Sequence, residues 1–231
     1  MNGTTFSKRN IVITAAHPDD TVAMGGTALL LKDRYKLHVL CMTRGERGIK
    51  GKTMEETAAI REEEERAACR LLDADVTFMG EIDQEVFAGR AICERTAAIL
   101  KELDPLAVFT LWPLNVPDHA AVYQITMQAL HMADLFFTTE FYLYETSPGG
   151  QTNDFTPDIH VNIDQTFEDK MQLMRCHKSQ YSNIPENAAD SPSSRFRGTL
   201  ARCERAEGFK MPWPLMAWRW GRKMNRLLLD L

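Results

Sequence analysis

Apolar runs alternate with amphipathic stretches along most of the chain. Short uninterrupted apolar runs predict buried strands, and longer stretches with apolar residues three or four positions apart predict helices. Strands are expected over residues 10–16, 37–42, 76–79, 106–111, 140–144 and 159–163, and helices over 21–31, 55–72, 84–103, 118–132 and 167–179. Strands separated by helices of this length indicate βαβ units. The pattern therefore predicts a single α/β domain with three layers, α/β/α, around a mainly parallel sheet.

Two segments fall outside this alternation. The polar stretch 182–194 contains two prolines and is expected to be a surface loop, and the tail 211–231, rich in Trp, Leu and Arg, is expected to dock on the domain. A tail of this composition could instead lie on a membrane surface. The polar residues 1–10 contain no apolar signal-peptide region, and no run of 18 apolar residues occurs. We therefore expect a cytoplasmic protein without a transmembrane segment.

Composition narrows the class of protein further. Apolar residues make up 44% and charged residues 26% of the 231 residues, which is ordinary for a globular chain and excludes disordered and collagen-like ones. The net charge of −5 argues against a dedicated nucleic-acid binder. The five cysteines are odd in number and form no CxxC pair, so they indicate reduced thiols rather than disulfides or a zinc knuckle.

The end of the first predicted strand carries the strongest chemical signal. His17, Asp19 and Asp20 follow a buried apolar run, and Pro18 stiffens the turn between them. In open parallel sheets, ligands bind outside the carboxyl ends of the strands. A purely structural interpretation of these residues is that they form a polar turn in which an aspartate is the N-cap of the next helix. The combination of His-Pro-Asp-Asp at a strand end favours a metal or catalytic site.

The end of the fourth predicted strand offers the partner for this site. Asp118 and His119 open the next helix there, and His119 alone would be an ordinary surface or cap histidine. The first and fourth strands of a doubly wound sheet can lie side by side at the switch point. His17, Asp20 and His119 then form a set of two histidines and one carboxylate, as in catalytic zinc sites with an open position for water. A neighbouring carboxylate could serve as the general base.

These segments resemble the LmbE-like, or PIG-L, family of metal-dependent N-acetylglucosamine de-N-acetylases, which have a Rossmann-like fold. Residues 16–20 match the family's first motif up to its last position, and residues 117–119 match the end of its second motif. Segments 43–51, 80–83 and 177–180, and residues 197–198 together with 206–209, resemble further family segments. The resemblance implies that His17, Asp20 and His119 bind zinc, with manganese or iron as alternatives. It implies that Asp19 is the general base, that Asp118 is catalytic, and that the substrate is a small N-acetylated sugar or related amide.

The chain departs from the family pattern at two positions. Thr21 stands where the family has a glutamate after the aspartate pair, and Val116 stands where it has a histidine that stabilises the tetrahedral intermediate. Loss of such a donor costs on the order of 10² to 10³ in rate. Asn115 could take that place if the loop is one residue shorter. A catalytically impaired or non-enzymatic metal- or sugar-binding relative is therefore the alternative function.

The remaining polar residues allow more than one interpretation. Arg44 and Glu46 are expected at the rim of the site as sugar contacts or in a solvated loop, and His177 is either a substrate contact or a structural histidine. The run Glu62–Glu65 is expected to be a solvated helix face. A magnesium phosphohydrolase or receiver domain also ends its first strand in aspartates, but magnesium prefers oxygen ligands over histidine. A homo-oligomer is compatible with the sequence.

Overall fold

An interior strand of the sheet, β1 (Arg9–Ala15), has its last five residues all buried. Burial on both faces is typical of a parallel strand that helices cover on each side. β1 pairs in parallel with β2 (Tyr35–Cys41) on one side and β4 (Ala107–Leu111) on the other. The structure, a computed structural model, describes residues 8–114, 116–146, 154–182, 192–212 and 227–231.

Within the described residues the sheet has seven strands in the order β3-β2-β1-β4-β5-β7-β6. The four further strands are β3 (Ala74–Phe78), β5 (Glu140–Tyr144), β6 (Ile159–Asn162) and β7 (Ala206–Lys210). Strands β1 to β5 are parallel to one another, whereas β7 runs antiparallel to both β5 and β6. The order reverses between β1 and β4, which places the switch point of the sheet at their carboxyl ends.

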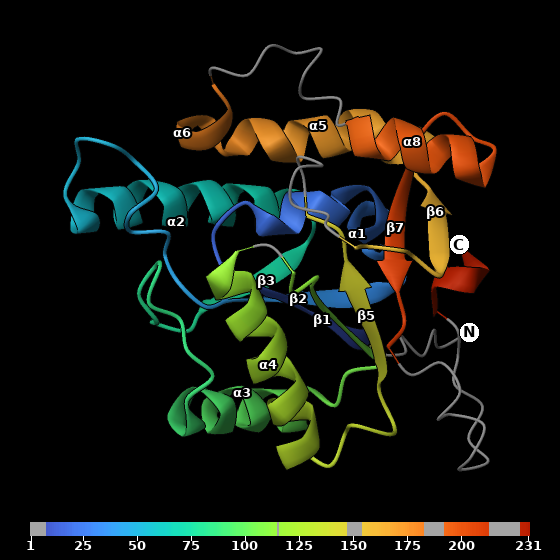
Figure 1. Cartoon of the computed structure of the whole chain (residues 1–231). Helices are drawn as coiled ribbons and strands as arrows, with labels where there is room; N and C mark the ends of the chain where they lie inside the picture. The colour runs from blue at the N-terminus through green and yellow to red at the C-terminus, as the bar shows by residue number, and fades with distance from the viewer. Residues whose placement is uncertain (1–7, 115, 147–153, 183–191, 213–226) are drawn as a thin grey trace, which may run out of the picture.

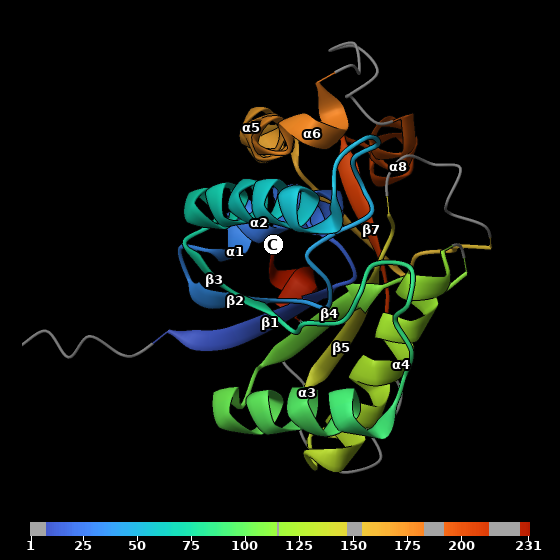
Figure 2. The ribbon, with the colours of Figure 1, turned by 90° about the vertical axis from the view of Figure 1, so that its left-hand side faces the viewer.

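Helices cover both faces of this sheet (Figures 1 and 2). On one side lie α1 (Gly25–Leu31), α2 (Met54–Leu71) and, packed on these two, α5 (Phe167–Cys176). The other side carries α3 (Arg90–Leu103) and α4 (Pro117–Met132), which pack against each other. The predicted α/β fold with a mainly parallel sheet and helices on both faces is confirmed.

Several predicted elements differ in their bounds, each for a local reason. The helix expected over 84–103 begins only at Arg90, because the backbone N–H groups of Gln84 and Val86 point at the Asp118 carboxylate instead of forming a helical turn. The helix expected over 21–31 starts as a 3₁₀ helix, η1 (Asp20–Met24), before α1. The helix expected over 167–179 breaks at His177, after which α6 (Lys178–Tyr181) follows.

The two segments outside the predicted alternation are only partly described. Helix α8 (Pro192–Ala201) begins inside the stretch 182–194, so the last three residues of the expected loop are helical, and residues 183–191 lie outside the described part. In the expected docking tail, residues 213–226 also lie outside it. Leu227 and Leu228 begin the 3₁₀ helix η4 (Leu227–Asp230) and are buried, with the Leu227 N–H donating to Glu140.

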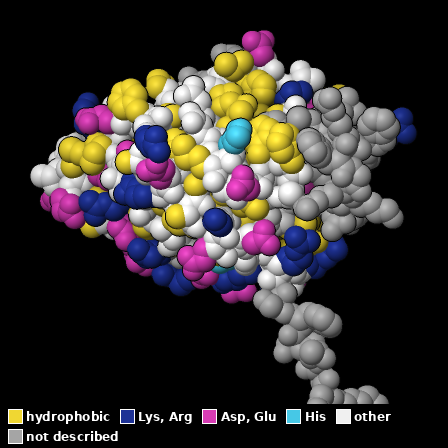
Figure 3. All heavy atoms as spheres, turned by 90° about the horizontal axis from the view of Figure 1, so that it is seen from below, with side chains coloured by type: hydrophobic (Ala, Val, Ile, Leu, Met, Phe, Trp, Pro, Cys, Tyr) yellow, Lys and Arg dark blue, Asp and Glu magenta, His cyan; other side chains and the backbone are white. Residues whose placement is uncertain are grey.

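The described surface mixes polar and apolar side chains. Seen from the side of α3 and α4, Lys and Arg side chains alternate with Asp and Glu around scattered hydrophobic groups (Figure 3). Among the described helices, none combines the length and the apolar character that crossing a membrane requires.

Candidate metal centre

The candidate site lies where β1 and β4 end side by side. The chain leaves β1 through His17 and Pro18 into η1, which places Asp20 in the first turn of that helix. The chain leaves β4 toward α4, where Pro117 is the first helical residue and His119 lies in the first turn. Proline is favoured at that position because its missing N–H has no partner there in any helix. The two motifs singled out in the sequence therefore meet at the switch point.

His17, Asp20 and His119 present their ligand atoms to one another. One nitrogen or oxygen from each lies within 4.8 Å of the others. The His119 Nε2 is 3.3 Å from Asp20 Oδ1, and the two imidazole rings have centroids 5.5 Å apart. Asp20 is fixed in place because its Oδ2 accepts the backbone N–H groups of Ala16 and His17, at 2.9 and 2.8 Å. Two imidazoles and one carboxylate are a donor set that suits a divalent ion such as zinc.

The Nε2 nitrogen of His17 faces two carboxylates. His17 Nε2 lies 3.0 Å from Asp118 Oδ2 and 3.2 Å from Asp83 Oδ1. Ionised carboxylates only accept hydrogen bonds, so Nε2 carries a proton, and Nδ1 is the nitrogen that faces Asp20, at 3.6 Å. Such a carboxylate–histidine pair fixes the tautomer of a metal ligand.

Charge around His17 favours a cation at this place. Burial by itself lowers the pKa of His17, but the hydrogen bonds to Asp118 and Asp83 and the charge of Asp20 outweigh it and raise the pKa to about 10. Burial also works against ionisation of Asp20, yet His119 and His17 hold the pKa of that carboxyl below its usual range. Three carboxylates therefore surround one imidazole, and this surplus of negative charge fits a site for a divalent ion.

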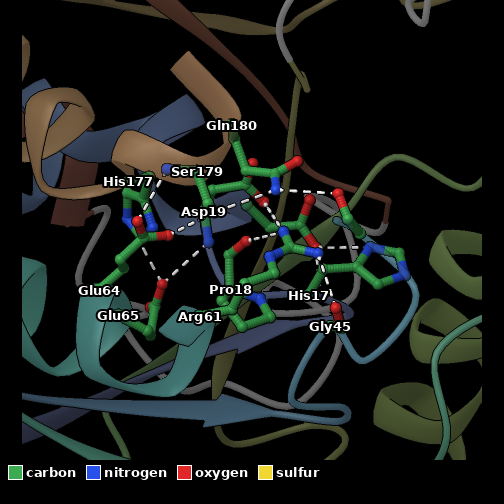
Figure 4. Close-up of polar contacts among 12 residues, drawn as sticks. His17, Pro18, Asp19, Gly45, Arg61, Glu64, Glu65, His177, Ser179 and Gln180 are labelled. Atoms are coloured by element: carbon green, nitrogen blue, oxygen red, sulfur yellow. Dashed lines mark hydrogen bonds and ion pairs between the residues drawn. The ribbon is translucent and has the colours of Figure 1, made fainter. Parts of the chain in front are cut away.

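Asp19 lies beside the three candidate ligands but is held differently. Its backbone is left-handed, with φ 99°, and its Oδ1 accepts from Arg61 Nη2 at 3.1 Å. Arg61 also donates to the carbonyl oxygens of Pro18 and Gly45, at 2.5 and 3.3 Å (Figure 4). Burial raises the pKa of Asp19 to about 7, although the Arg61 charge opposes that shift. A carboxylate with such a pKa can exchange a proton near neutral pH.

The other predicted site residues are near the site but engaged within the protein. Glu46 is buried, and its carboxylate accepts the backbone N–H of Asp83 at 3.2 Å. The Arg44 guanidinium faces Glu46, Glu55 and Glu62 at 3.6, 3.3 and 3.9 Å, with about a third of its side chain exposed. Arg44 is thus the more accessible of the two rim residues, whereas Glu46 supports the segment that carries Asp83.

His177 is buried beside Glu65. Its side chain has no exposed surface, and its Nε2 lies 3.6 Å from Glu65 Oε2, with no hydrogen-bond partner on either nitrogen among the described residues. Burial lowers the pKa of His177 to about 3, and the nearby Arg61 charge adds to that shift. This placement favours the structural interpretation over a substrate contact. Asn115, the alternative donor, lies outside the described residues.

Three residues of the site were not among the predicted site residues. Asp83 follows β3, which is separated from β1 by β2, and Arg61 and Glu65 project from α2 toward Asp19 (Figure 4). Glu65 belongs to the run that the sequence predicted to be solvated, and that prediction is wrong for this residue, because it is fully buried. For Arg61 and Glu65, helical spacing was the signal that could have indicated burial. Both belong to one buried stripe along α2 and its C-cap residue, which consists of positions 57, 58, 61, 65, 68, 69 and 72.

The fold and the site together define a class of protein: a doubly wound α/β domain with a two-histidine, one-carboxylate site and an adjacent aspartate at its switch point. The chain belongs to the GlcNAc-PI de-N-acetylase (PIG-L) family, whose model matches residues 12–130. This confirms the family that the sequence motifs indicated.

Similar proteins span most of the chain but carry two different activities in their names. The probable N-acetyl-alpha-D-glucosaminyl L-malate deacetylase 2 of Bacillus cereus is 25% identical over 84% of this chain and 93% of its own. The 4-oxalmesaconate hydratase of Pseudomonas putida is also 25% identical, over 75% of this chain and 74% of its own. The crystal structure of the conserved protein TT1542 from Thermus thermophilus has a TM-score of 0.77 and 26% identity, covering 92% of this chain and 98% of that one.

Proposed function

We propose that this protein is a zinc-dependent deacetylase that removes the acetyl group from an N-acetylglucosamine-type sugar or a related small amide. The observation that carries the proposal is the cluster of His17, Asp20 and His119, with the raised-pKa carboxylate of Asp19 beside it. The family match and the Bacillus cereus relative support a deacetylase activity on substrates of this kind. Manganese or iron would suit the same donors, because affinity order and availability together decide which metal is bound.

The residues present fit a divalent ion by their donor chemistry and by the surrounding negative charge. His17 Nδ1, Asp20 Oδ1 and His119 Nε2 would hold the ion, and Asp118 would keep His17 in the required tautomer. When bound, a zinc ion polarises a carbonyl group and lowers the pKa of water from 15.7 toward about 7.

The protein's own groups would carry the proton transfers. Asp19 in its ionised form takes a proton from the attacking water, and the protonated Asp19 then gives a proton to the leaving amine. Its pKa of about 7 suits both directions near neutral pH. Arg61 holds the Asp19 carboxylate by one oxygen, at 3.1 Å, and so fixes its orientation. The overall reaction consumes one water and yields acetate and a free amine.

Val116 bears on how fast this reaction runs. It is the N-cap residue of α4, one turn from His119, and a valine side chain has no hydrogen-bond donor. Without a donor at this position, the negative oxygen of the tetrahedral intermediate loses a stabilising contact. We therefore expect slow turnover, and a catalytically impaired relative remains the alternative.

A second candidate is hydration of an unsaturated acid, favoured by the Pseudomonas putida hydratase at the same 25% identity. In a hydratase reaction, water adds across a carbon–carbon double bond and no amine is released. An ion held by the same donors, with a nearby base, could serve that chemistry as well. The two candidates differ in their products, which makes them separable.

The test combines metal analysis with product detection. Purified wild type and the variants His17→Ala, Asp20→Ala and His119→Ala are dialysed against chelator, reloaded with zinc and analysed for bound metal. Each is then incubated with a panel of N-acetyl sugars and, separately, with unsaturated dicarboxylic acids. The proposal expects one metal per wild-type chain, loss of metal in each variant, and amine release by the wild type alone. Full metal retention in all three variants, or consumption of an unsaturated acid without any amine release, would overturn it.

A further inference from the structure

Glu65 is a carboxylate in the middle of α2 whose side chain has no exposed surface. A buried carboxylate costs free energy unless hydrogen bonds compensate for its lost hydration. Glu65 Oε2 accepts the backbone N–H of Asp19 at 2.9 Å, and Glu65 Oε1 accepts from Thr21 Oγ1 at 3.0 Å. The thiol of Cys69 and the ring of His177 lie farther from its oxygens, at 3.8 and 3.6 Å. The short contacts of Glu65 are therefore made to the turn that follows β1.

That turn is strained where Glu65 holds it. Asp19 has φ 99°, a left-handed conformation that residues other than glycine rarely adopt. Such a conformation persists only where the surroundings impose it. The surroundings include two side chains one helical turn apart on α2: Glu65 binds the N–H of Asp19, and Arg61 binds its carboxylate and the preceding carbonyl oxygen of Pro18 (Figure 4).

We propose that Glu65 is a positioning residue: it holds the Asp19 peptide in its left-handed conformation and so aims the Asp19 carboxylate at the reacting water. This inference rests on the role of Asp19 under the proposed function. Thr21 takes part as the second anchor, because its hydroxyl donates to the other oxygen of Glu65 and ties η1 to α2. The hydrogen bonds of Glu65 go to Asp19 and Thr21 rather than to the three candidate metal ligands, so its effect is on Asp19.

The variants Glu65→Leu and Glu65→Gln separate this role from simple packing. Leucine removes both acceptors, leaving the Asp19 N–H without a partner, whereas glutamine keeps one oxygen for that N–H. On zinc-loaded protein, Glu65→Leu is expected to keep its metal and its KM, while kcat falls by about 10- to 100-fold, the scale of a misplacement near the reacting atoms. Glu65→Gln is expected to recover most of that loss.

Leu72→Ala is the matched control, because Leu72 is also buried and caps the carboxyl end of the same helix, two turns beyond Glu65. It is expected to lower the thermal midpoint by creating a cavity and to leave kcat unchanged. A parallel loss of kcat in Leu72→Ala, or loss of metal in Glu65→Leu, would mean that Glu65 acts only through folding, and the inference would fail.

Hydrogen exchange of the Asp19 amide, followed by NMR on the same samples, gives a readout that does not depend on turnover. The amide is expected to be protected in the wild type and in Glu65→Gln, and to exchange faster in Glu65→Leu but not in Leu72→Ala. An unprotected amide in the wild type, or equal exchange in all variants, overturns the inference. If the wild type releases no amine from any sugar, the proposed function fails, while the exchange data still decide whether Glu65 holds Asp19.

Discussion

His177→Leu provides a test of whether this histidine is a neutral core residue. The His177 side chain is fully buried, and burial together with the Arg61 charge lowers its pKa to about 3. In the unfolded chain the pKa returns to about 6.5. Below pH 6.5 the unfolded chain therefore binds a proton that the folded protein does not, and the folded state loses stability as the pH falls.

The size of this effect follows from the two pKa values. At pH 5, about 1.5 units below the pKa of histidine in the unfolded chain, protonation of the imidazole stabilises the unfolded state. Relative to pH 8, this lowers the free energy of unfolding by about 2 kcal/mol. Glu65 acts in the opposite direction: burial raises its pKa to about 7, so its contribution to stability is present at low pH and is lost as the pH rises from about 4.5 to 7. The effect of His177 must therefore be measured as a difference between two proteins.

The assay is urea denaturation of wild type and His177→Leu at pH 8 and pH 5. The free energy of unfolding of the wild type, relative to that of the variant, should fall by about 2 kcal/mol between these two pH values. Leucine leaves no nitrogen to titrate, and the wild-type ring has no hydrogen-bond partner to lose among the described residues. A difference that stays constant with pH would refute the assignment of His177 as a buried neutral ring.

Three further predictions concern the site. Asp118→Asn should weaken metal binding by about 10- to 100-fold in chelator competition, because the carboxylate that orients His17 is lost; unchanged affinity would argue against that role. Gly45→Ala should destabilise the protein by at least about 1 kcal/mol in thermal denaturation and lower kcat, since Gly45 has φ 67° and a Cβ there would lie 2.4 Å from Arg61 Nη1. Val116→His should raise kcat by up to about 10²-fold with little change in KM, and an inert variant would mean that another donor already serves the intermediate.

The strand-end residues were predictable because topology alone brings them together. An apolar run followed by His-Pro-Asp-Asp, and another followed by Pro-Asp-His, mark two carboxyl ends, and the reversal of strand order makes β1 and β4 neighbours. The distances among His17, Asp20 and His119 agree with that expectation. Asp118 was expected to be catalytic, and the structure places it against His17 Nε2, where it can orient the ring.

The residues around this cluster were harder to predict because their roles depend on tertiary contacts. Glu65 belongs to the run predicted to be a solvated helix face, and Arg61 directly precedes that run, yet both face Asp19. Gln84 and Val86 fit a helical pattern, but their N–H groups bind Asp118 and the helix starts later. In each case a polar contact from a distant segment outweighs the local preference, which is typical of functional sites.

The comparison of wild type with Asp19→Asn tests the central claim most directly. Both proteins are loaded with zinc, dialysed and analysed for metal content, and amine release is then measured on one accepted N-acetyl sugar. Because Asp19 is outside the set of metal ligands, both should hold one metal per chain, while kcat of the variant falls by about 10² to 10⁴, the scale of a lost general base. A variant that loses its metal together with its activity, or one that keeps full activity, would contradict the account.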